Sequence, residues 1–193
     1  MKNTIKNSYT VAAASLTGHA SNVTGSAWTI ATAKAGDGLA HHVTIRNDAV
    51  VDHSAKTIVL TGFGPNGEAI TEALAAPGIS ATVTSTKAFW SLASATPSAT
   101  IDADTFDIGW AATAQTAWID TNNTPAVAAV AIGGTINFDI QHTYDELNVD
   151  AVAFNSEAAK TANIEHLYTI PVRAVRVDVN SHTSGTFSLY VTQ

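Results

Sequence analysis

Short runs in which apolar and polar residues alternate restrict the fold of this chain more than any other feature. The alternation is clearest in Thr135–Ile140 and Ala174–Val179. A period of two puts every second side chain on the same face of a β-strand, so these runs predict strands with one buried face. Similar runs recur along the chain at His42–Arg46, Thr57–Thr61, Val83–Ser85, Phe89–Leu92, Thr105–Trp110 and Thr186–Val191. Many short strands with turns between them predict an all-β fold, a β-sandwich, jelly roll or barrel.

The segments between these strands contain turn signals and one helix signal. Asn66-Gly67 is a strong hairpin signal because both residues tolerate positive φ. Glu68–Ala76 fits either a helix or the second strand of that hairpin. Ser156–Glu165 is the best helix candidate, since Ser156 can cap it and its alanines favour helix. Two further turns are expected, at Asp102–Asp104 and Asn180–Gly185.

The N-terminal residues 1–27 lack a sustained period and contain scattered polar residues and glycines. We therefore predict an extended arm there, followed by a β-sandwich domain over residues 28–193. Tyr9, Val11 and Leu16 give the arm more apolar character than a solvated tail needs, so it is expected to contact a neighbouring molecule. The alternative is an ordinary first strand of the domain.

The chain also contains a weak internal echo. Thr57–Leu60, Phe89-Trp90 and Thr105–Ile108 are followed in the same order by Thr135–Phe138, Leu167-Tyr168 and Thr186–Leu189. A true duplication implies two related β halves, residues 40–114 and 115–193. Chance similarity between β-rich segments is the other explanation.

Composition limits the classes of function. Apolar residues make up 46% of the 193 residues, enough for a packed interior, whereas charged residues make up only 13%. A weakly charged, Thr-rich surface is typical of chains that pack against other chains, although Thr is also simply a good strand former. Association into a closed symmetric oligomer is therefore expected, with a homotrimer as the predicted form.

Charge and hydropathy exclude several partners. The net charge is −7, and the only arginines are Arg46, Arg173 and Arg176, so nucleic-acid binding is not expected. The longest apolar run, Ala126–Ile132, is far shorter than the ~20 residues that span a bilayer. The apolar run Val11–Ala14 is too short for a signal peptide, so no membrane or secretion step is expected. The absence of Cys excludes disulfides and thiolate chemistry.

Two motifs resemble ligand sites but depart from them. Gly62-x-Gly64-x-x-Gly67 matches the glycine spacing of a dinucleotide fingerprint, but position 87 is Lys where an acidic residue is needed, and a turn replaces the helix. Asp102-x-Asp104-x-x-Asp107 resembles the start of a calcium loop, but position 113 is Thr where a Glu is needed. Both are expected to be turns that lead into strands.

The histidines and tryptophans give no complete site. His41 and His42 are adjacent and face opposite sides of a strand, so a metal site would need His53 with Asp48 or Asp52 from across a hairpin. Of the four tryptophans, Trp90 and Trp110 are expected in the core or an interface, and Trp28 or Trp118 could serve a glycan-binding surface. Asn22 and Asn122 each begin a glycosylation triplet, which has no role without secretion. We therefore assign no catalytic, cofactor-binding or metal residue.

Two stretches resemble small virion structural proteins of tailed bacteriophages. The first is Val43–Asp48, then Thr57–Glu72 with its Gly-Phe-Gly-Pro-Asn-Gly hairpin and Ile-Thr-Glu strand, then Thr84–Phe89. The second is the chain end, Val172–Ser181 with Leu189–Gln193. Together they cover about half of the chain with short motifs, and the family has no catalytic residues to carry over.

The resemblance implies a non-enzymatic role in the virion. The first expectation is a capsid decoration or cement protein that is made in the host cytoplasm and binds and stabilises the major capsid protein shell on the capsid surface. The resemblance does not separate this role from a tail or neck component, or from a receptor-binding module that recognises carbohydrate. A β-sandwich enzyme is the alternative from another class.

Overall fold

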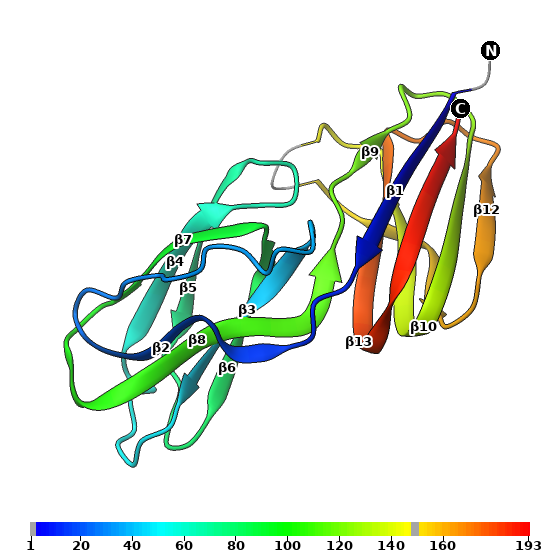
Figure 1. Ribbon diagram of the computed structural model, residues 1–193. Coiled ribbons are helices and arrows are strands. Elements are labelled where there is room, and N and C mark those ends of the chain that lie inside the picture. The colour runs from blue at the N-terminus through cyan, green and yellow to red at the C-terminus, as the bar shows by residue number, and fades with distance from the viewer. Residues whose placement is uncertain (1–2, 148–150) are drawn as a thin grey trace. The chain divides into compact units, whose positions relative to one another are not determined.

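The computed structural model describes residues 3–147 and 151–193, and Figure 1 shows the path of the chain. The described residues form thirteen strands and contain no helix, so none of their segments is a helix that could cross a membrane. The chain divides into two compact units. Unit 1 comprises residues 1–13, 37–39 and 112–193, and unit 2 comprises residues 14–36 and 40–111.

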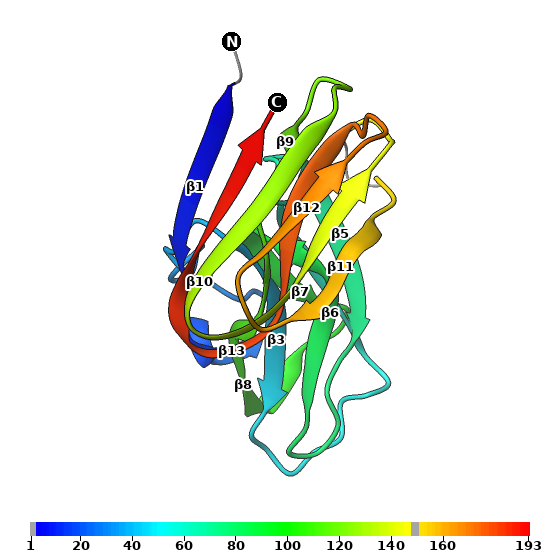
Figure 2. The same ribbon diagram turned by 90° about the vertical axis from the view of Figure 1, so that its right-hand side faces the viewer.

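Unit 1 is organised around two long, antiparallel strands, β10 (Ala126–Thr143) and β13 (Ala174–Thr192). The first half of β10 pairs with β12 (Ile164–Tyr168), and the second half pairs with β11 (Phe154–Lys160). The second half of β13 pairs with β1 (Thr4–Thr10), and the first half with the short β9 (Ile119–Asp120). Figure 2 shows β11 and β12 close to β10.

The core of unit 1 comes from the alternation in these two strands. Ile136, Phe138 and Ile140 of β10 are buried, as are Val175, Val177 and Val179 of β13, while the residues between them are more exposed. The strands predicted at Thr135–Ile140, Ala174–Val179 and Thr186–Val191 are thereby confirmed, the last two as parts of one strand.

Unit 2 is a sandwich of two antiparallel sheets. One contains β2 (Ser15–Gly25), β8 (Ile101–Gln115, whose last residues belong to unit 1), β3 (Ala40–Asn47) and β6 (Thr82–Phe89). The other contains β5 (Ala69–Ala75), β4 (Thr57–Phe63) and β7 (Ser91–Pro97). Buried side chains from both sheets fill the space between them, among them Ile45, Ile58, Leu60, Leu92, Phe106 and Ile108.

These two units confirm the predicted all-β class. The Asn66-Gly67 hairpin is also confirmed: it joins β4 to β5, and Gly67 has a φ of 82°. The ambiguous Glu68–Ala76 segment is therefore a strand, because pairing with β4 outweighs the helix preference of its alanines.

The predicted helix at Ser156–Glu165 is wrong. Its residues form most of β11, the start of β12 and the connection between them. Ala159 has a φ of 51°, which is incompatible with a right-handed helix, and its N–H donates to the buried Asp139 at 2.7 Å. Pairing with β10 supplies hydrogen bonds and burial that an isolated helix of this length lacks, so tertiary contacts override propensity.

The expectation of a separate arm at residues 1–27 also needs correction. β1 pairs with β13 along its whole length, from Thr4 opposite Thr192 to Thr10 opposite Thr186. β2 pairs with β8 through a register that shifts three times. Such irregular pairing gives no clean alternation in the sequence, so the strand could not be recognised from its period. The alternative, that this segment supplies ordinary strands of the β body, describes it better.

Two predicted turns lie inside strands. Asp102–Asp104 belongs to β8, and Asn180–Gly185 belongs to β13, where β10 and β13 shift in register near Asn137. The repeat segments are not equivalent in pairing either. Thr57–Leu60 pairs with β5 and β7, whereas Thr135–Phe138 pairs with β13. The division into units near residue 111 nevertheless lies close to the boundary proposed between the halves.

Candidate interaction surfaces

A cluster of aromatic rings gathers on unit 1 where β10, β11 and β12 meet. The ring of His142 lies 5.2 Å from that of Tyr144, 5.6 Å from that of Phe154 and 5.6 Å from that of Tyr168, measured between centroids. His166 extends the cluster, with its ring 4.6 Å from that of Tyr168. Because three strands contribute, the cluster exists only once the sheet has formed.

Contacts with the Ser156 hydroxyl hold two of these rings in place. The Ser156 hydroxyl lies 2.7 Å from Nδ1 of His142 and 2.6 Å from the Tyr168 hydroxyl. Burial raises the pKa of Tyr168 to about 12 and lowers that of His142, so both side chains are uncharged near neutral pH. The inner part of the cluster is therefore uncharged and held by hydrogen bonds.

Charged groups lie at one side of the cluster. Glu157 is 2.9 Å from Nζ of Lys160 and 3.0 Å from Nδ1 of His166. These two hydrogen bonds, the one from Lys160 being the stronger influence, lower the pKa of Glu157 and keep it ionised.

Large apolar side chains extend the cluster to the surface. Ile170 is 69% exposed, and Tyr144 and Phe154 are also exposed. A recess of about 170 Å³ is lined by His142, Tyr144, His166, Tyr168 and Ile170 among others. We call this surface the aromatic patch, and its members are His142, Tyr144, Phe154, His166, Tyr168 and Ile170.

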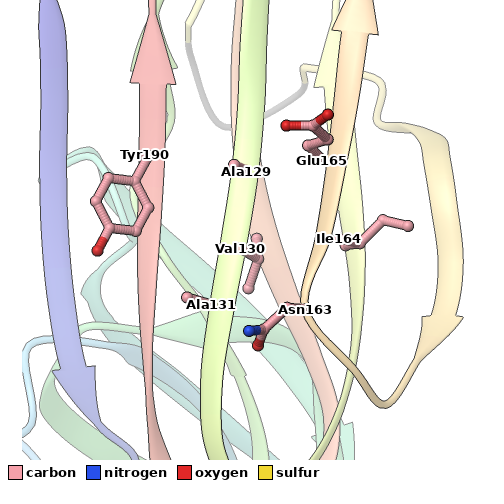
Figure 3. A pocket seen from close by; sticks show the side chains of 7 residues that line it. All are labelled: Ala129, Val130, Ala131, Asn163, Ile164, Glu165 and Tyr190. Carbon is pink, nitrogen blue, oxygen red and sulfur yellow. The ribbon is translucent and has the colours of Figure 1, made fainter.

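A second surface of unit 1 is the outward side of the four strands β1, β13, β10 and β12, which we call the outer face. Strand register sets its side chains in rows. The middle row runs Lys6, Tyr190, Ala129, Glu165. Figure 3 shows Tyr190 on one side of the row and Glu165 on the other, with Ala129 between them.

The neighbouring rows of the outer face are uncharged and, apart from the exposed Leu167, consist of smaller side chains. One runs Thr4, Thr192, Val127, Leu167, and the other includes Ser8, Ser188 and Ala131. Beside Tyr190 lies an open groove of about 320 Å³, lined by Ala129, Ala131, Asn163 and Glu165 among others. In the middle of the face, the bulky Tyr190 therefore lies next to a hollow.

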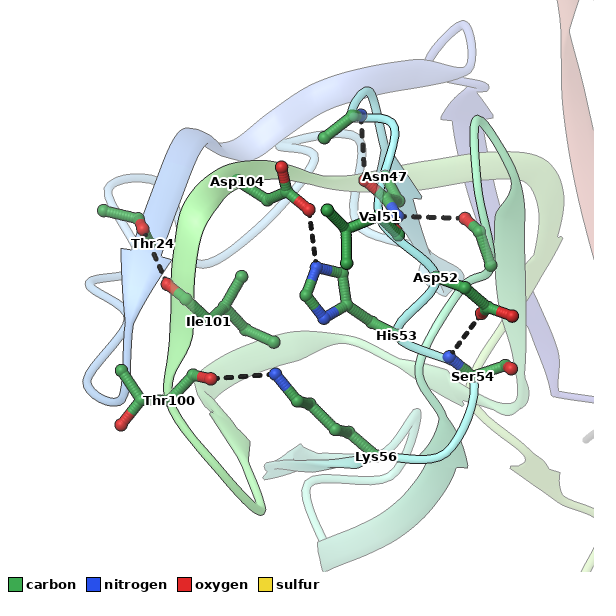
Figure 4. Close-up of polar contacts among 12 residues, drawn as sticks. Thr24, Asn47, Val51, Asp52, His53, Ser54, Lys56, Thr100, Ile101 and Asp104 are labelled. Carbon is green, nitrogen blue, oxygen red and sulfur yellow. Dashed lines mark hydrogen bonds and ion pairs between the residues drawn. The ribbon is translucent and has the colours of Figure 1, made fainter.

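One of the candidate histidines, His53, forms a buried pair with Asp104 in unit 2. Nε2 of His53 lies 2.7 Å from Asp104, and both side chains are buried (Figure 4). His53 also packs on Phe106, and the Lys56 ammonium donates to the Thr100 carbonyl close by. No hydroxyl among the described residues hydrogen-bonds to His53, so the pair anchors the segment before β4 and is not extended to a triad.

The other candidate ligands lie apart from this pair. His41 is buried, and its Nδ1 lies 3.0 Å from the Ala111 carbonyl. Asp107 accepts from Arg46 at 2.8 Å and from the Asn22 N–H at 3.0 Å. Burial raises the pKa of Asp107, but these hydrogen bonds outweigh it and lower the pKa overall. Over residues 3–147 and 151–193, no three His, Cys, Asp or Glu side chains are placed to hold a metal ion.

The glycine motif and the tryptophans also have structural places. The Gly64 N–H donates to the Glu68 carbonyl, and the Gly64 carbonyl accepts from the Gly67 N–H, inside the β4–β5 hairpin. Trp28 is buried and stacks on Phe106, and Trp118 is buried beneath Arg176. Neither tryptophan offers the open platform expected for a glycan. Exposed aromatic rings include Phe63 in unit 2 and Tyr144 and Phe154 of the aromatic patch, and sequence analysis did not identify the patch.

No protein-family model matches the chain, and no curated protein matches it. Several solved structures are similar to it, two of them from the same virus. One is that of infectious bursal disease virus, Gx strain, at 12% identity and a TM-score of 0.22, covering 100% of this chain and 72% of the other. The second is the VP2 subviral particle of infectious bursal disease virus, at 10% identity and a TM-score of 0.22, covering 99% and 72%. A TM-score of 0.22 is too low to establish a shared fold or a shared role.

Proposed function

We propose that this protein is a non-catalytic component of a tailed-phage particle, and that it decorates the head by binding the major capsid protein through the aromatic patch. The patch is the observation that carries the proposal. It gathers exposed apolar side chains that cost free energy in water, and contiguous patches of this kind mark interaction sites. The sequence resemblance to phage virion proteins supplies the partner.

The construction of the patch suits a protein partner. Its inner rings are fixed by Ser156 and by contacts with one another, so little side-chain entropy is lost on binding. Tyrosine and phenylalanine are enriched at interface centres, whereas charges are depleted there. Here Glu157 and Lys160 lie at one side, as rim residues do.

The mechanism we propose is stabilisation by contact area. Each copy on the shell adds a small binding free energy, and the total grows with the number of copies. On this view the buried His53–Asp104 pair is structural, and no side chain performs chemistry.

The recess within the patch favours a second candidate, a receptor-binding module of the tail. An exposed tyrosine ring beside histidine and glutamate side chains is also a surface on which a sugar can stack and hydrogen-bond. A glycan array separates the two: sugar binding that Tyr144→Ala abolishes, without shell binding, favours the receptor role.

The position and number of copies in the particle test the proposal first. Electron microscopy of particles with the protein labelled should show hundreds of copies over the head. Six or twelve copies at one vertex would instead identify a neck or tail component.

Binding to shells that lack the protein tests the patch. Ile170→Asp puts a charge into the exposed apolar rim and should weaken binding about tenfold or more. Val50→Asp is the matched control, because Val50 is 81% exposed but lies in unit 2. Equal binding by both variants would rule out the patch as the docking site.

A further inference from the structure

We infer that the outer face of unit 1 joins two copies of this chain around a two-fold axis that runs along the strands, between β13 and β10. The inference concerns a different surface from the one proposed to bind the shell, and it does not depend on that proposal. It rests on the order of charged, bulky and small side chains across the middle row of the face.

The two charged side chains of the middle row cannot pair within one chain. Lys6 and Glu165 lie on the outermost strands, three strand spacings apart, which is about 14 Å. Among the described residues neither forms an ion pair. The Lys6 ammonium instead lies 5.2 Å from the centre of the Tyr190 ring.

A two-fold rotation about the proposed axis keeps each row and reverses the order of the strands. It places Lys6 opposite Glu165 of the second copy, and Glu165 opposite Lys6 of the second copy. It also places Tyr190 opposite Ala129, so that each tyrosine enters the groove beside the other copy's tyrosine. In each dimer, a large side chain therefore faces a small one twice, and a positive side chain faces a negative one twice.

The remaining rows permit this approach. Thr192 meets Val127 of the second copy, Ser188 meets Ala131, and the exposed Leu167 meets Thr4, so no charge is buried and each bulky side chain faces a small one. Sheets pack face to face at about 10 Å with strands within about 30° of each other, and this arrangement satisfies that geometry. Isologous interfaces require such self-complementarity, whereas a foreign partner would have to supply the same pattern by chance.

The size of the face predicts weak association. Four strands spaced about 4.8 Å apart and seven residues long at about 3.4 Å each give an area of roughly 450 Å². A stable interface buries about 800 Å² on each partner. The dimer should therefore depend on concentration and form most readily where copies are crowded. A two-fold contact differs from the trimer expected from composition, and the trimer stays a prediction that the same measurement tests.

Sedimentation velocity over a range of concentrations up to about 1 mM tests the inference. The wild-type protein should show a reversible monomer–dimer equilibrium. Lys6→Glu and Glu165→Lys should each weaken it about tenfold or more, since each creates two like-charge contacts per dimer. The double variant restores both pairs and should return the dissociation constant to within about threefold of wild type.

The controls separate this interface from other causes. Lys34→Glu changes net charge equally but lies in unit 2, and it should leave the equilibrium unchanged. Thermal melting of Lys6→Glu and Glu165→Lys should match wild type, because these two side chains are exposed. A wild-type monomer at all concentrations, an oligomer insensitive to either reversal, or a double variant that stays dissociated would each overturn the inference. None of these outcomes affects shell binding, which Ile170→Asp tests separately.

Discussion

Asp139 shows how much one buried carboxylate can organise in this protein. Its side chain accepts hydrogen bonds from Asn155 at 3.0 Å, from the Ala159 N–H at 2.7 Å and from Asn180 at 2.8 Å. The donors lie in β11 and β13, on either side of β10. At the scale of single residues, Asp139 therefore sets the path of β11, and with it the position of Phe154 in the aromatic patch.

We expect Asp139→Ala to destabilise the protein by about 2–3 kcal/mol. The change removes three hydrogen bonds that converge on one buried carboxyl group. Asn137→Ala is the control, since Asn137 lies in the same strand and accepts only from Asn180 at the surface. Denaturant unfolding measures both variants, and a loss below about 0.5 kcal/mol for Asp139→Ala would contradict this role.

His19 should make stability depend on pH. Its ring packs edge-on against Trp110, and its Nδ1 lies 2.6 Å from the Thr32 carbonyl. Burial lowers the pKa of His19 below its ordinary value, more than the hydrogen bond to Thr32 raises it. The unfolded chain therefore binds a proton more readily than the folded protein, and the stability contribution is present above the unfolded pKa of about 6.5.

This contribution should be lost as the pH falls from about 6.5 through the folded-state pKa. The free energy of unfolding, measured by denaturant titration between pH 7.5 and pH 5, should decrease for wild type and change less for His19→Gln. The pKa of His142 is also lowered by burial, so His142→Gln should remove a further part of the slope. A variant series with identical slopes would show that neither histidine is responsible.

At the scale of elements, the two long strands of unit 1, β10 and β13, depend on glycine at the point where each strand passes from its first half to its second half. Gly134 and Gly185 face each other with φ values of 108° and 143°. A Cβ on Gly134 would lie 2.6 Å from the Ser184 carbonyl oxygen.

Gly134→Ala should therefore cost about 1–3 kcal/mol, since the strained backbone and the contact act together. The adjacent Gly133→Ala is a close control: it lacks the positive φ, and its nearest contact is the Thr186 hydroxyl at 3.1 Å. Thermal unfolding of the two variants should differ clearly, and equal melting temperatures would argue against a constrained crossing.

Local pattern predicted the strands whose two faces differ in burial. Thr57–Thr61 and Thr105–Trp110 are examples, and the all-β class follows from them. The local pattern failed where pairing with a neighbouring strand decides the structure of a segment. Asn180–Gly185 has the composition of a turn, yet β13 continues through it because β10 lies alongside. Ser156–Glu165 has the composition of a helix, yet Asp139 and β10 hold it in strands.

The aromatic patch could not be predicted because its rings come from three strands whose pairing the sequence does not specify. One signal was present. His142-Thr143-Tyr144 and His166-Leu167-Tyr168 share the spacing His-x-Tyr, which puts both rings of each segment on one face of a strand. Only the fold shows that the two segments lie together and that Phe154 stacks on His142.

At the scale of the whole molecule, the chain builds two cores. Phe138 is fully buried in unit 1, and Phe106 is fully buried in unit 2. We expect two unfolding transitions, because each unit has its own buried cluster.

Phe138→Ala should lower the free energy of unfolding of unit 1, and Phe106→Ala that of unit 2, each by about 3–5 kcal/mol. Differential scanning calorimetry resolves the two transitions. A single transition lowered equally by both variants would show that the units unfold together.

The pairing of β1 with β13 also matters while the protein is being synthesised. β1 leaves the ribosome long before its partner, Thr186–Thr192, has been synthesised. Translation adds roughly 5–20 residues per second, so β1 waits many seconds with Ile5 and Tyr9 uncovered, while the residues of unit 2 can already fold. A nascent strand with open hydrogen-bonding edges is prone to wrong pairing. The yield of folded protein in the cell that makes it should therefore depend on chaperones that shield β1 until translation reaches β13.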